Sequence, residues 1–393
     1  MTKTTHRGHN ADPGSGPPAA RAQAPGAVPA PVGRGPSTPR ARGDSAPDQG
    51  GGALSPPARV GLSFSAVNAA PLLSLPFMDG NLANLEPELR ASVRSGDLFL
   101  DEVTGHLIAA GGKRLRPGLA LAAATAGGRT ASPDDLQGAV AVELVHLASL
   151  YHDDVMDEAT MRRTVQSVNA RWGNLVAIVA GDFLLARSAE IAASLGTEIA
   201  GLLAHTLGQL CQGQVAEVRA AYSAERTEEH YFGAIAGKTA ALMATSCRIG
   251  ALTGGRPRDE VEALTTYGRC FGMVFQMRDD ILDVIGTEEE LGKVPGQDLA
   301  EGIYTLPVLK ALQDPGAGGE LGPLLGRPLD QPERDKARAI VGGSGAIEAT
   351  VAAGRRYVAE AVAAAASLPA ADLGRGLGDL ARGLLDDLPV RSV

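Results

Sequence analysis

The hydrophobic positions of this chain follow a helical spacing rather than a strand-like alternation. In the run LQGAVAVELVHLASLYHDD, apolar residues recur three and four positions apart and form one stripe, made by Val140, Leu144, Leu147 and Tyr151. A second apolar stripe adjoins it, so this helix is apolar nearly all round and is expected to be central in the core. Ser132 and Pro133 predict where it begins, with the serine as N-terminal cap and the proline in the first turn.

Further helices follow the same spacing and are separated by short stretches rich in Gly, Pro and Asp. No strand–helix–strand repeat or glycine-rich nucleotide loop interrupts the helical pattern of the sequence. The pattern therefore predicts an all-α domain. The other predicted helices cover residues 174–195, 198–221, 227–252, 258–285 and 344–366.

The N-terminal part of the chain has a different composition. Residues 1–60 are rich in Pro, Gly and Ala, lack Ile and Phe, and contain a single leucine, Leu54. Such a segment buries too little apolar surface to offset the entropy that ordering costs. We therefore divide the chain into a disordered tail, residues 1–75, and a folded domain, residues 76–393. The first helix-like sequence opens at Met78, which is also a candidate for the true start of the protein.

The charge distribution excludes some classes of partner. The formal net charge is -9, and no dense block of Lys and Arg offers the basic face that a nucleic acid needs. No uncharged apolar run reaches the roughly 18 residues of a membrane-spanning helix. The three cysteines, Cys211, Cys247 and Cys270, have no metal-ligand spacing and form no even-numbered framework, so we expect a reducing, cytoplasmic setting without disulfides.

Two copies of the pattern Asp-Asp-x-x-Asp directly follow apolar helical runs. The first comprises Asp153, Asp154 and Asp157, and the second comprises Asp279, Asp280 and Asp283. In each copy, two aspartates four residues apart share a helix face, and the middle one lies about 100° round. Two carboxylates about 4 Å apart repel by about 4 kcal/mol at an effective dielectric constant of about 20, so facing clusters need cations. Mg²⁺ suits them, because it binds a few carboxylates together with substrate phosphates.

A single pattern of this kind is more often a helix cap or a solvated helix face than a metal site. Two copies at the ends of apolar helices favour the metal site instead. A calcium loop is a poor fit, because neither copy continues with the D-x-D-x-D-G spacing and the distal glutamate of that motif.

Basic residues occur in small groups beside predicted helix ends. GGKRLRP supplies Lys113, Arg114 and Arg116 after a glycine pair, where backbone and side-chain donors can surround an anion. Further cations follow the first acidic cluster or stand in glycine-containing segments, at Arg162, Arg163, Lys238 and Lys293. With the carboxylates they predict a pocket for two phosphorylated groups. One group would be bridged to the protein by Mg²⁺, and the other would be held directly by Lys and Arg.

These residues resemble those of the trans-isoprenyl diphosphate synthases, the polyprenyl synthetase family. Between residues 78 and 393 the resemblance runs, in order, through GGKRLRP, HLASLYHDDVMD, RR, NARWGN, GDFLLARS, GKT, FQMRDDILD and GKVPGQDL. It implies an isoprenoid synthase-type helical bundle around a deep central cavity and makes residues 76–393 the catalytic domain. It also implies Mg²⁺ as cofactor, isopentenyl diphosphate and an allylic diphosphate as substrates, and a homodimer.

The resemblance assigns roles to individual residues. The direct Mg²⁺ ligands would be Asp153, Asp157 and Asp279. Asp154, Asp280 and Asp283 would support them, and Asp154 and Asp283 are further candidate metal ligands. The allylic diphosphate and its reacting carbon would contact Arg162, Lys238, Thr239, Gln276 and Lys293. Isopentenyl diphosphate would contact Lys113, Arg116, His146 and Arg163, although His146 without this match would be interpreted as a satisfied core histidine. The residues expected to act in catalysis are Asp153, Asp154, Asp157, Arg162, Lys238, Asp279 and Asp280.

The chemistry that the resemblance implies follows from these charges. Mg²⁺ and the basic residues stabilise diphosphate as it leaves the allylic substrate. The double bond of isopentenyl diphosphate attacks the resulting cation, and loss of a proton gives a trans product. No residue in these motifs is an obvious base, and in the family the departing diphosphate is thought to accept that proton. The apolar helices exclude water, which would quench the cation.

Small residues before the first acidic cluster bear on product length. Ser149 and Ala148 lie four and five residues before Asp153, one turn deeper in the helix, with Val145 below them. Bulky aromatic residues at these positions would form a floor, whereas the small ones leave the path open, and Tyr151 points elsewhere. HLASLYHDDVMD and NARWGN resemble the longer-chain bacterial enzymes that make quinone side chains. We therefore predict a product longer than about C20, because the wall that this helix face presents is open.

Three alternatives stay open on the sequence. The chain could be a geranylgeranyl diphosphate synthase. A class I terpene cyclase also uses an aspartate cluster with Mg²⁺, but it would carry a different second motif and no isopentenyl diphosphate site. A regulatory subunit of a heteromeric synthase would usually have lost one aspartate cluster. Two positions depart from the family pattern: Thr164, where glycine commonly follows the arginine pair, and Arg278, where a small residue is frequent.

Overall fold

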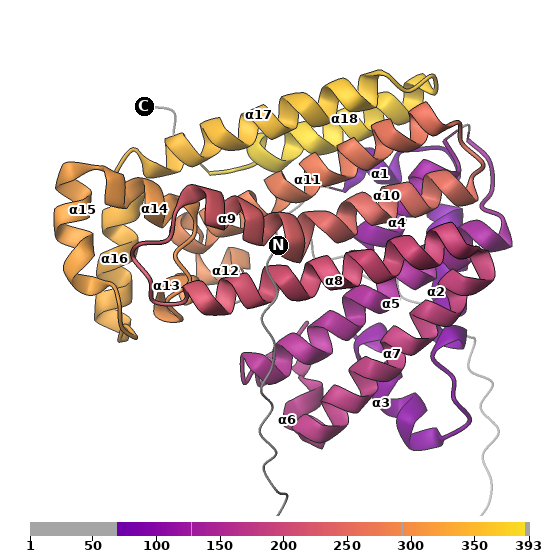
Figure 1. Ribbon diagram of the computed structural model, residues 1–393, viewed down its shortest axis with the longest axis horizontal. Helices are drawn as coiled ribbons and strands as arrows, with labels where there is room; N and C mark the ends of the chain where they lie inside the picture. Colours follow the sequence, from indigo (N-terminus) through magenta and orange to yellow (C-terminus); the bar gives the residue numbers. More distant parts are fainter. Residues whose placement is uncertain (1–68, 127, 292–293, 390–393) are drawn as a thin grey trace, which may run out of the picture. The chain divides into compact units, whose positions relative to one another are not determined.

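The computed structural model describes residues 69–126, 128–291 and 294–389, and these residues are almost entirely helical (Figure 1). The first helices are α1 (Ala70–Leu73), α2 (Met78–Ser92), α3 (Leu98–Ala109), α4 (Leu115–Ala124), α5 (Pro133–Met156), α6 (Val168–Trp172), α7 (Asn174–Leu195) and α8 (Thr197–Ala220). A hairpin of two short antiparallel strands, β1 (Met161–Arg162) and β2 (Val165–Gln166), follows α5. The predicted all-α class is confirmed.

The second half of the chain is helical throughout its described residues. Its longer elements are α9 (Glu228–Ile235), the π-helix η1 (Ala236–Ala240), α10 (Ala241–Thr253), α11 (Arg258–Ile285), α14 (Leu306–Gln313), α16 (Gln331–Gly343), α17 (Ala346–Ala366) and α18 (Ala371–Asp386). Short turns complete it at α12 (Glu288–Leu291), α13 (Gln297–Ala300), α15 (Pro315–Leu321) and η2 (Gly322–Leu324).

The helix at the centre of the core is α5, as its apolar pattern predicts. Ser132 Oγ accepts a hydrogen bond from the Asp135 N–H, and the Asp135 carboxylate accepts one from the Ser132 N–H. This capping box begins the helix where the sequence predicts it. α5 packs against α2, α4, α7 and α10, so its predicted stripes are buried on several sides at once.

The second long helix of the core is α11, which packs on α10, α17 and α18. η1 contacts both α8 and α11. Small residues allow some of these helices to meet backbone to backbone. A Cβ added to Gly250 on α10 would lie 1.9 Å from the Ala120 carbonyl oxygen of α4, which makes glycine the residue that fits there.

The predicted helix boundaries agree with most of the structure. The helices expected at residues 174–195 and 258–285 match α7 and α11 at both ends. The helix expected at 227–252 is instead divided into α9, η1 and α10, because AGKTA widens to a π-helix. None of the helices in the described ranges is long and apolar enough to span a membrane.

The predicted tail, residues 1–75, lies mostly outside the described residues. Its last part forms α1, whose Leu72 is buried and which packs against α18. The folded part therefore begins earlier than residue 76. An apolar pair in the sequence LLSLPF supplies the buried surface that the preceding segment lacks. Met78 is the first residue of α2, as its helix-like sequence predicts.

Candidate active site

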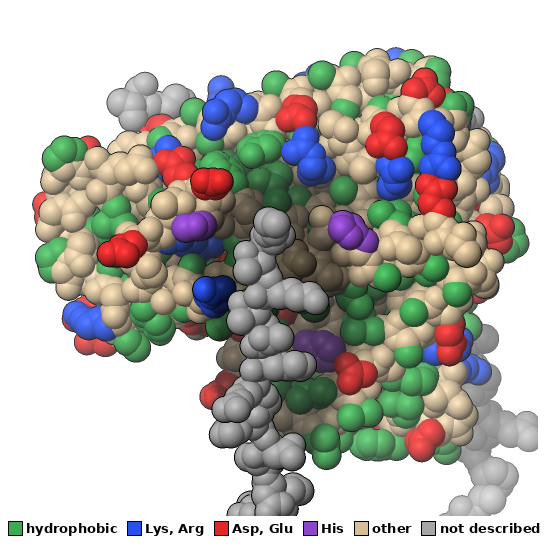
Figure 2. All heavy atoms as spheres, viewed as in Figure 1, with side chains coloured by type: hydrophobic (Ala, Val, Ile, Leu, Met, Phe, Trp, Pro, Cys, Tyr) green, Lys and Arg blue, Asp and Glu red, His purple; other side chains and the backbone are tan. Residues whose placement is uncertain are grey.

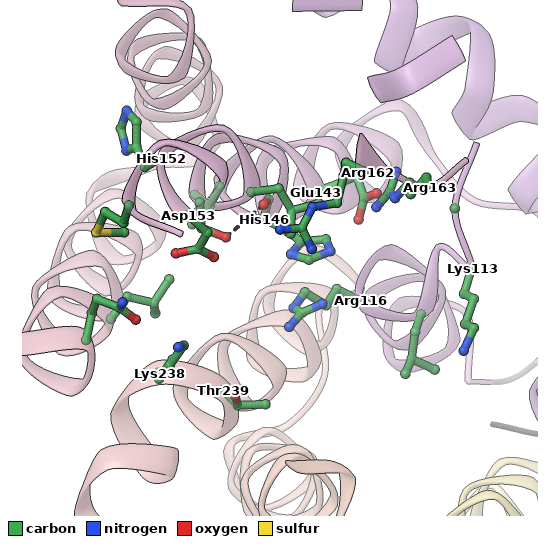
Figure 3. A pocket seen from close by; sticks show the side chains of 18 of the residues that line it. Lys113, Arg116, Glu143, His146, His152, Asp153, Arg162, Arg163, Lys238 and Thr239 are labelled. Carbon is green, nitrogen blue, oxygen red and sulfur yellow. Dashed lines mark hydrogen bonds between the residues drawn. The ribbon is translucent and has the colours of Figure 1, made fainter. Parts of the chain in front are cut away.

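A cavity of about 1440 Å³ lies among α5, α7, α8, η1 and α11, with the loop before α4 and the β1–β2 hairpin at its rim. It is larger than the about 300–1,000 Å³ of most ligand pockets. Figure 3 shows the side chains that converge on it from these elements. Residues predicted from sequence that line the cavity are Lys113, Arg116, Val145, His146, Ser149, Asp153, Arg162, Arg163, Lys238, Thr239, Gln276 and Asp279.

One part of the wall is strongly cationic. Arg116 points into the cavity (Figure 3), and its Nε has no hydrogen-bond partner within the described part of the chain. Burial lowers the pKa of Arg116 to about 10, which still leaves the guanidinium charged at neutral pH. Burial, and then the charges of Arg116 and Arg163, hold the pKa of His146 well below its usual range. A neutral His146 beside the Arg116 guanidinium, whose Nε is unsatisfied among the described residues, is a donor set suited to an anion.

The glycine pair before α4 makes room for Arg163. Arg163 Nη1 donates a hydrogen bond to the Gly111 carbonyl and a second one, at 3.3 Å, to the Leu107 carbonyl. A Cβ on Gly112 would lie 2.8 Å from the same Nη1, and Gly112 has a φ of 154° that disfavours other residues. Arg163 therefore both lines the cavity and fixes the loop that carries Lys113 and leads into α4, where Arg116 lies.

Arg114 borders the cavity, but its guanidinium is paired with glutamates and is not available to an anion as the sequence suggested. It is buried, and it donates to Glu86 at 2.6 Å and to Glu143 at 2.8 Å. Glu143 lies on α5 and also lines the cavity, although the sequence reasoning did not select it. The signal was present, because a glutamate inside a nearly all-apolar helix needs a buried partner.

The carboxylates of the two acidic clusters reach the cavity through one member each. Asp153 on α5 and Asp279 on α11 lie on its wall. Burial raises the pKa of Asp153, and the charge of Lys238 opposes the rise. Asp157 is the C-terminal cap of α5, one turn beyond Asp153 and off the wall. Partial burial of its carboxyl group raises the pKa, and the charge of Lys238 opposes the rise.

Asp154 turns away from the cavity. It is fully buried. Arg162 donates to its Oδ1 through Nε at 2.7 Å and forms an ion pair with the same oxygen through Nη2 at 2.6 Å. Its Oδ2 has no hydrogen-bond partner among the described residues. The prediction of Asp154 as a metal ligand is therefore replaced by a supporting role, because its carboxylate is committed to orienting Arg162 from the hairpin.

The second cluster uses Asp280 as a support as well. The Asp280 carboxylate accepts from Tyr231 Oη at 2.5 Å and from Gln276 Nε2 at 2.9 Å, and Gln276 Oε1 accepts from Thr239 Oγ1 at 2.8 Å. Burial raises the pKa of Asp280 to about 7. This chain of hydrogen bonds fixes Gln276 and Thr239 at the cavity wall, which sequence alone did not predict.

Asp283 and Lys293 are not placed on the wall. Asp283 is buried and accepts a 3.2 Å hydrogen bond from the Asp298 N–H, so it secures the first turn of α13. The prediction of Asp283 as a metal ligand is corrected for that reason. Lys293 lies outside the described residues.

The comparison with known proteins agrees with this arrangement. The sequence model of the family described as polyprenyl synthetase matches residues 98–341, more than half of the chain. The chain belongs to the polyprenyl synthetase family. Heptaprenyl diphosphate synthase component 2 of Geobacillus stearothermophilus is 40% identical over 317 residues, which cover 79% of this chain and 95% of that protein.

Solved structures of other polyprenyl synthetases share the fold. A decaprenyl diphosphate synthase from Rhodobacter capsulatus is 34% identical with a TM-score of 0.74, over 81% of this chain and 99% of that one. A geranylgeranyl pyrophosphate synthase from Corynebacterium glutamicum, complexed with calcium and isoprenyl diphosphate, is 37% identical with a TM-score of 0.70, over 79% and 96%. The predicted family and helical-bundle fold are confirmed.

The apolar wall of this polyprenyl synthetase contains only some of the residues that the sequence predicted for it. Val145 and Ser149 line it, but Ala148 lies off the wall and is fully buried. On α5, Ala148 lies about 140° round from Asp153, whereas Ser149 lies within about 40°. Tyr151 is not a floor, since its hydroxyl donates to the Val103 carbonyl in the core. Side chains that the sequence reasoning missed complete the wall from α7, α8 and α11, at Ile178, Leu185, Leu207, Leu210, Cys211, Val215 and Phe275.

The polar residues fit a hard divalent cation that a substrate helps to bind. The atoms near the cavity that could bind a metal are carboxylate oxygens. Burial raises the pKa values of Asp153 and Asp157, so their negative charge is disfavoured there, and a bound cation would stabilise it. The described residues contain no group of three His, Cys, Asp or Glu side chains that would enclose a metal by itself. Such an arrangement suits Mg²⁺, which usually binds through one or two carboxylates plus substrate phosphates.

The two departures from the family pattern have structural explanations. Arg163 and Thr164 form the two-residue turn of the hairpin, and both have positive φ, 51° and 67°. Such turns favour glycine, so Thr164 is strained where the family commonly has glycine. Arg278 is buried and donates to the Leu384 carbonyl at 2.5 Å, so it caps the C-terminal end of α18.

Proposed function

We propose that this chain is a trans-prenyltransferase that condenses isopentenyl diphosphate with an allylic diphosphate. The observation that carries the proposal is one cavity with three regions. A cationic region surrounds Arg116, a carboxylate region surrounds Asp153 and Asp279, and an apolar wall extends along α5, α7 and α8. Family membership supports the reaction class.

Each region has a role in this proposal. Asp153 and Asp279, with Asp157 beside them, would hold Mg²⁺, which supplies positive charge against the diphosphate that departs. Lys238 and Arg162 bind the allylic diphosphate, and the network from Asp280 through Gln276 to Thr239 orients that part of the wall. Buried groups held in place in this way stabilise developing charge without reorganising.

The acceptor substrate occupies the cationic region. Lys113, Arg116 and Arg163 bind the diphosphate of isopentenyl diphosphate, beside a neutral His146. Its double bond then forms the new carbon–carbon bond with the allylic carbon as the carbon–oxygen bond to diphosphate breaks. A proton then passes from C2 of the former isopentenyl unit to the departed diphosphate, and the hydrocarbon is neutral again. The apolar wall keeps water from the cation.

The size of the cavity supports a product longer than about C20, suited to a quinone side chain, because the cavity is larger than a typical pocket of about 300–1,000 Å³. Ser149 and Val145 leave the path along α5 open. The relatives include a heptaprenyl and a decaprenyl diphosphate synthase by name, whereas a geranylgeranyl pyrophosphate synthase also matches and represents the second candidate.

Assays with and without isopentenyl diphosphate test the reaction class. Purified protein with Mg²⁺ and an allylic diphosphate should form product only when isopentenyl diphosphate is added. Hydrocarbon formed from the allylic substrate alone would instead show a terpene cyclase. A chain that is inert until a second protein is added would show one component of a heteromeric synthase, and the relative from Geobacillus stearothermophilus is named as such a component.

We also propose that the chain forms a homodimer. α7 and α8 expose apolar side chains on one face, and residues 199–216 of α8 contain no Asp, Glu, Lys or Arg. The exposed residues are Leu175, Ile178, Val179, Val215 and Val218. This face is largely green and tan in Figure 2, and contiguous apolar surface of this kind marks interaction sites.

Light scattering should give twice the chain mass of 40.2 kDa, and Val179→Glu should shift the protein to the monomer. A wild-type monomer would contradict this assembly.

A further inference from the structure

A carboxylate outside both aspartate clusters contacts the cavity lysine. Glu217 on α8 forms an ion pair with Lys238 of η1 through its Oε2. The Glu217 side chain is 13% exposed and that of Lys238 is 35% exposed, so the pair is mostly shielded from water. Shielded pairs of this kind are held in a defined geometry more than surface pairs are.

Close packing of two glycines fixes the distance between the partners. A Cβ on Gly213 of α8 would lie 2.4 Å from the Lys238 backbone nitrogen, and one on Gly237 would lie 2.7 Å from the Gln209 carbonyl oxygen. The backbones of α8 and η1 are therefore in contact. Glu217 lies one turn after Gly213 on the same face of α8, which brings its carboxylate to Lys238. η1 is a π-helix, an element that occurs frequently at functional sites.

Glu217 lies among groups of the same charge. It interacts electrostatically with Asp157 of the first cluster and Asp280 of the second, while Lys238 interacts with Asp153 and Asp157. A further buried carboxylate here adds repulsion, so Lys238 is its compensating partner. The ammonium group is consequently shared between Glu217 and the first aspartate cluster.

We propose that Glu217 is a positioning residue that holds Lys238 away from Asp153 and Asp157. These two carboxylates then stay available to a divalent cation, and the lysine side chain stays directed at the diphosphate. The inference rests on the proposed function. Without Glu217, the ammonium group is free to pair with Asp153 and Asp157 and to compete with the cation. Glu217 thus sets cation affinity through Lys238 rather than by touching the cation.

Cation binding without turnover tests this role. Mn²⁺ is titrated into the full chain in the presence of inorganic pyrophosphate, and free Mn²⁺ is measured by electron paramagnetic resonance. Glu217→Gln should weaken Mn²⁺ binding about tenfold, the size expected when one contact in a charged network is lost. Glu198→Gln, the same change at the exposed start of α8, should leave binding unchanged. Circular dichroism and melting confirm that the variants fold.

The Lys238→Met background separates positioning from simple loss of negative charge. If Glu217 acts through Lys238, Glu217→Gln should have little further effect on Mn²⁺ binding in that background. An equal weakening in both backgrounds, or no weakening in the wild-type background, would overturn the inference. Failure of the wild-type protein to bind Mn²⁺ with pyrophosphate would overturn the proposed cation site itself, and this inference with it.

Discussion

At the scale of single residues, two neighbouring arginines have different roles. Arg114 and Arg116 stand two positions apart in GGKRLRP. Arg114 is buried between Glu86 and Glu143 and stabilises the fold, whereas Arg116 faces the cavity with an unsatisfied Nε among the described residues. Sequence identifies both as cations, and only the contacts distinguish a structural role from a binding role.

Substitution of these two arginines should separate the roles. Arg116→Met should raise the KM for isopentenyl diphosphate about tenfold or more, because a hydrogen bond to a charged group contributes about 1.5–3 kcal/mol. Its melting temperature should change little. Arg114→Met should instead lower the melting temperature, because it leaves Glu143 buried without its partner. Steady-state kinetics and thermal melting check both, and an unchanged KM in Arg116→Met would refute the binding role.

The strained hairpin turn gives a second prediction at this scale. Thr164 has a φ of 67°, and a β-branched residue in this region costs about 1–3 kcal/mol. Thr164→Gly should therefore raise the free energy of unfolding by about 1 kcal/mol, after the larger entropy of glycine in the unfolded chain is subtracted. Thr160→Gly, at a residue without positive φ, should lower it. Urea unfolding measures both, and equal losses would show that the turn is not strained.

At the scale of elements, the faces of helices decide which side chains reach the cavity. Ser149→Phe should shorten the product, because Ser149 lines the cavity on α5. Ala148→Phe should leave product length unchanged and destabilise the protein instead, since Ala148 is fully buried away from the wall. Chromatography after dephosphorylation measures product length. Shortening by Ala148→Phe but not by Ser149→Phe would contradict the placement of this wall.

Helix contacts made backbone to backbone give the stability prediction at this scale. Gly250→Ala places a Cβ 1.9 Å from the Ala120 carbonyl oxygen and should cost about 3 kcal/mol of stability, at the upper end of overpacking effects. Gly208→Ala, in α8 with open space around it, should be neutral or slightly stabilising. Urea denaturation compares them, and a similar stability for both variants would contradict the close contact of α10 with α4.

Sequence predicted the elements well wherever local signals were strong. The apolar periodicity and the Ser132 cap were sufficient to predict α5, α7 and α11, because apolar spacing and capping chemistry are local. It did not predict η1, where Gly213 packs against Gly237, or the side chains that hold Asp154 and Asp280, Arg162 and Tyr231. Motifs identify reactive residue types, whereas tertiary contacts determine which of them face the cavity.

At the scale of the whole molecule, the described bundle joins two charged regions to one long apolar wall. α5 contributes to all three, through His146, Asp153 and Ser149, and it packs against α2, α4, α7 and α10. Successive condensations need this combination, because each product keeps the diphosphate of the former isopentenyl unit. That diphosphate must occupy the carboxylate region for the next round, while the hydrocarbon extends along the apolar wall. The volume of about 1440 Å³ allows extension beyond a short product.

The central claim is tested most directly by the products that the purified chain makes. The chain is incubated with Mg²⁺, labelled isopentenyl diphosphate and farnesyl or geranylgeranyl diphosphate, and the products are sized after dephosphorylation. The account predicts label in all-trans polyprenols longer than about C20, as the size of the cavity implies, with no product when Mg²⁺ is removed. Products that stop at about C20, or no incorporation of label from any allylic primer, would contradict it.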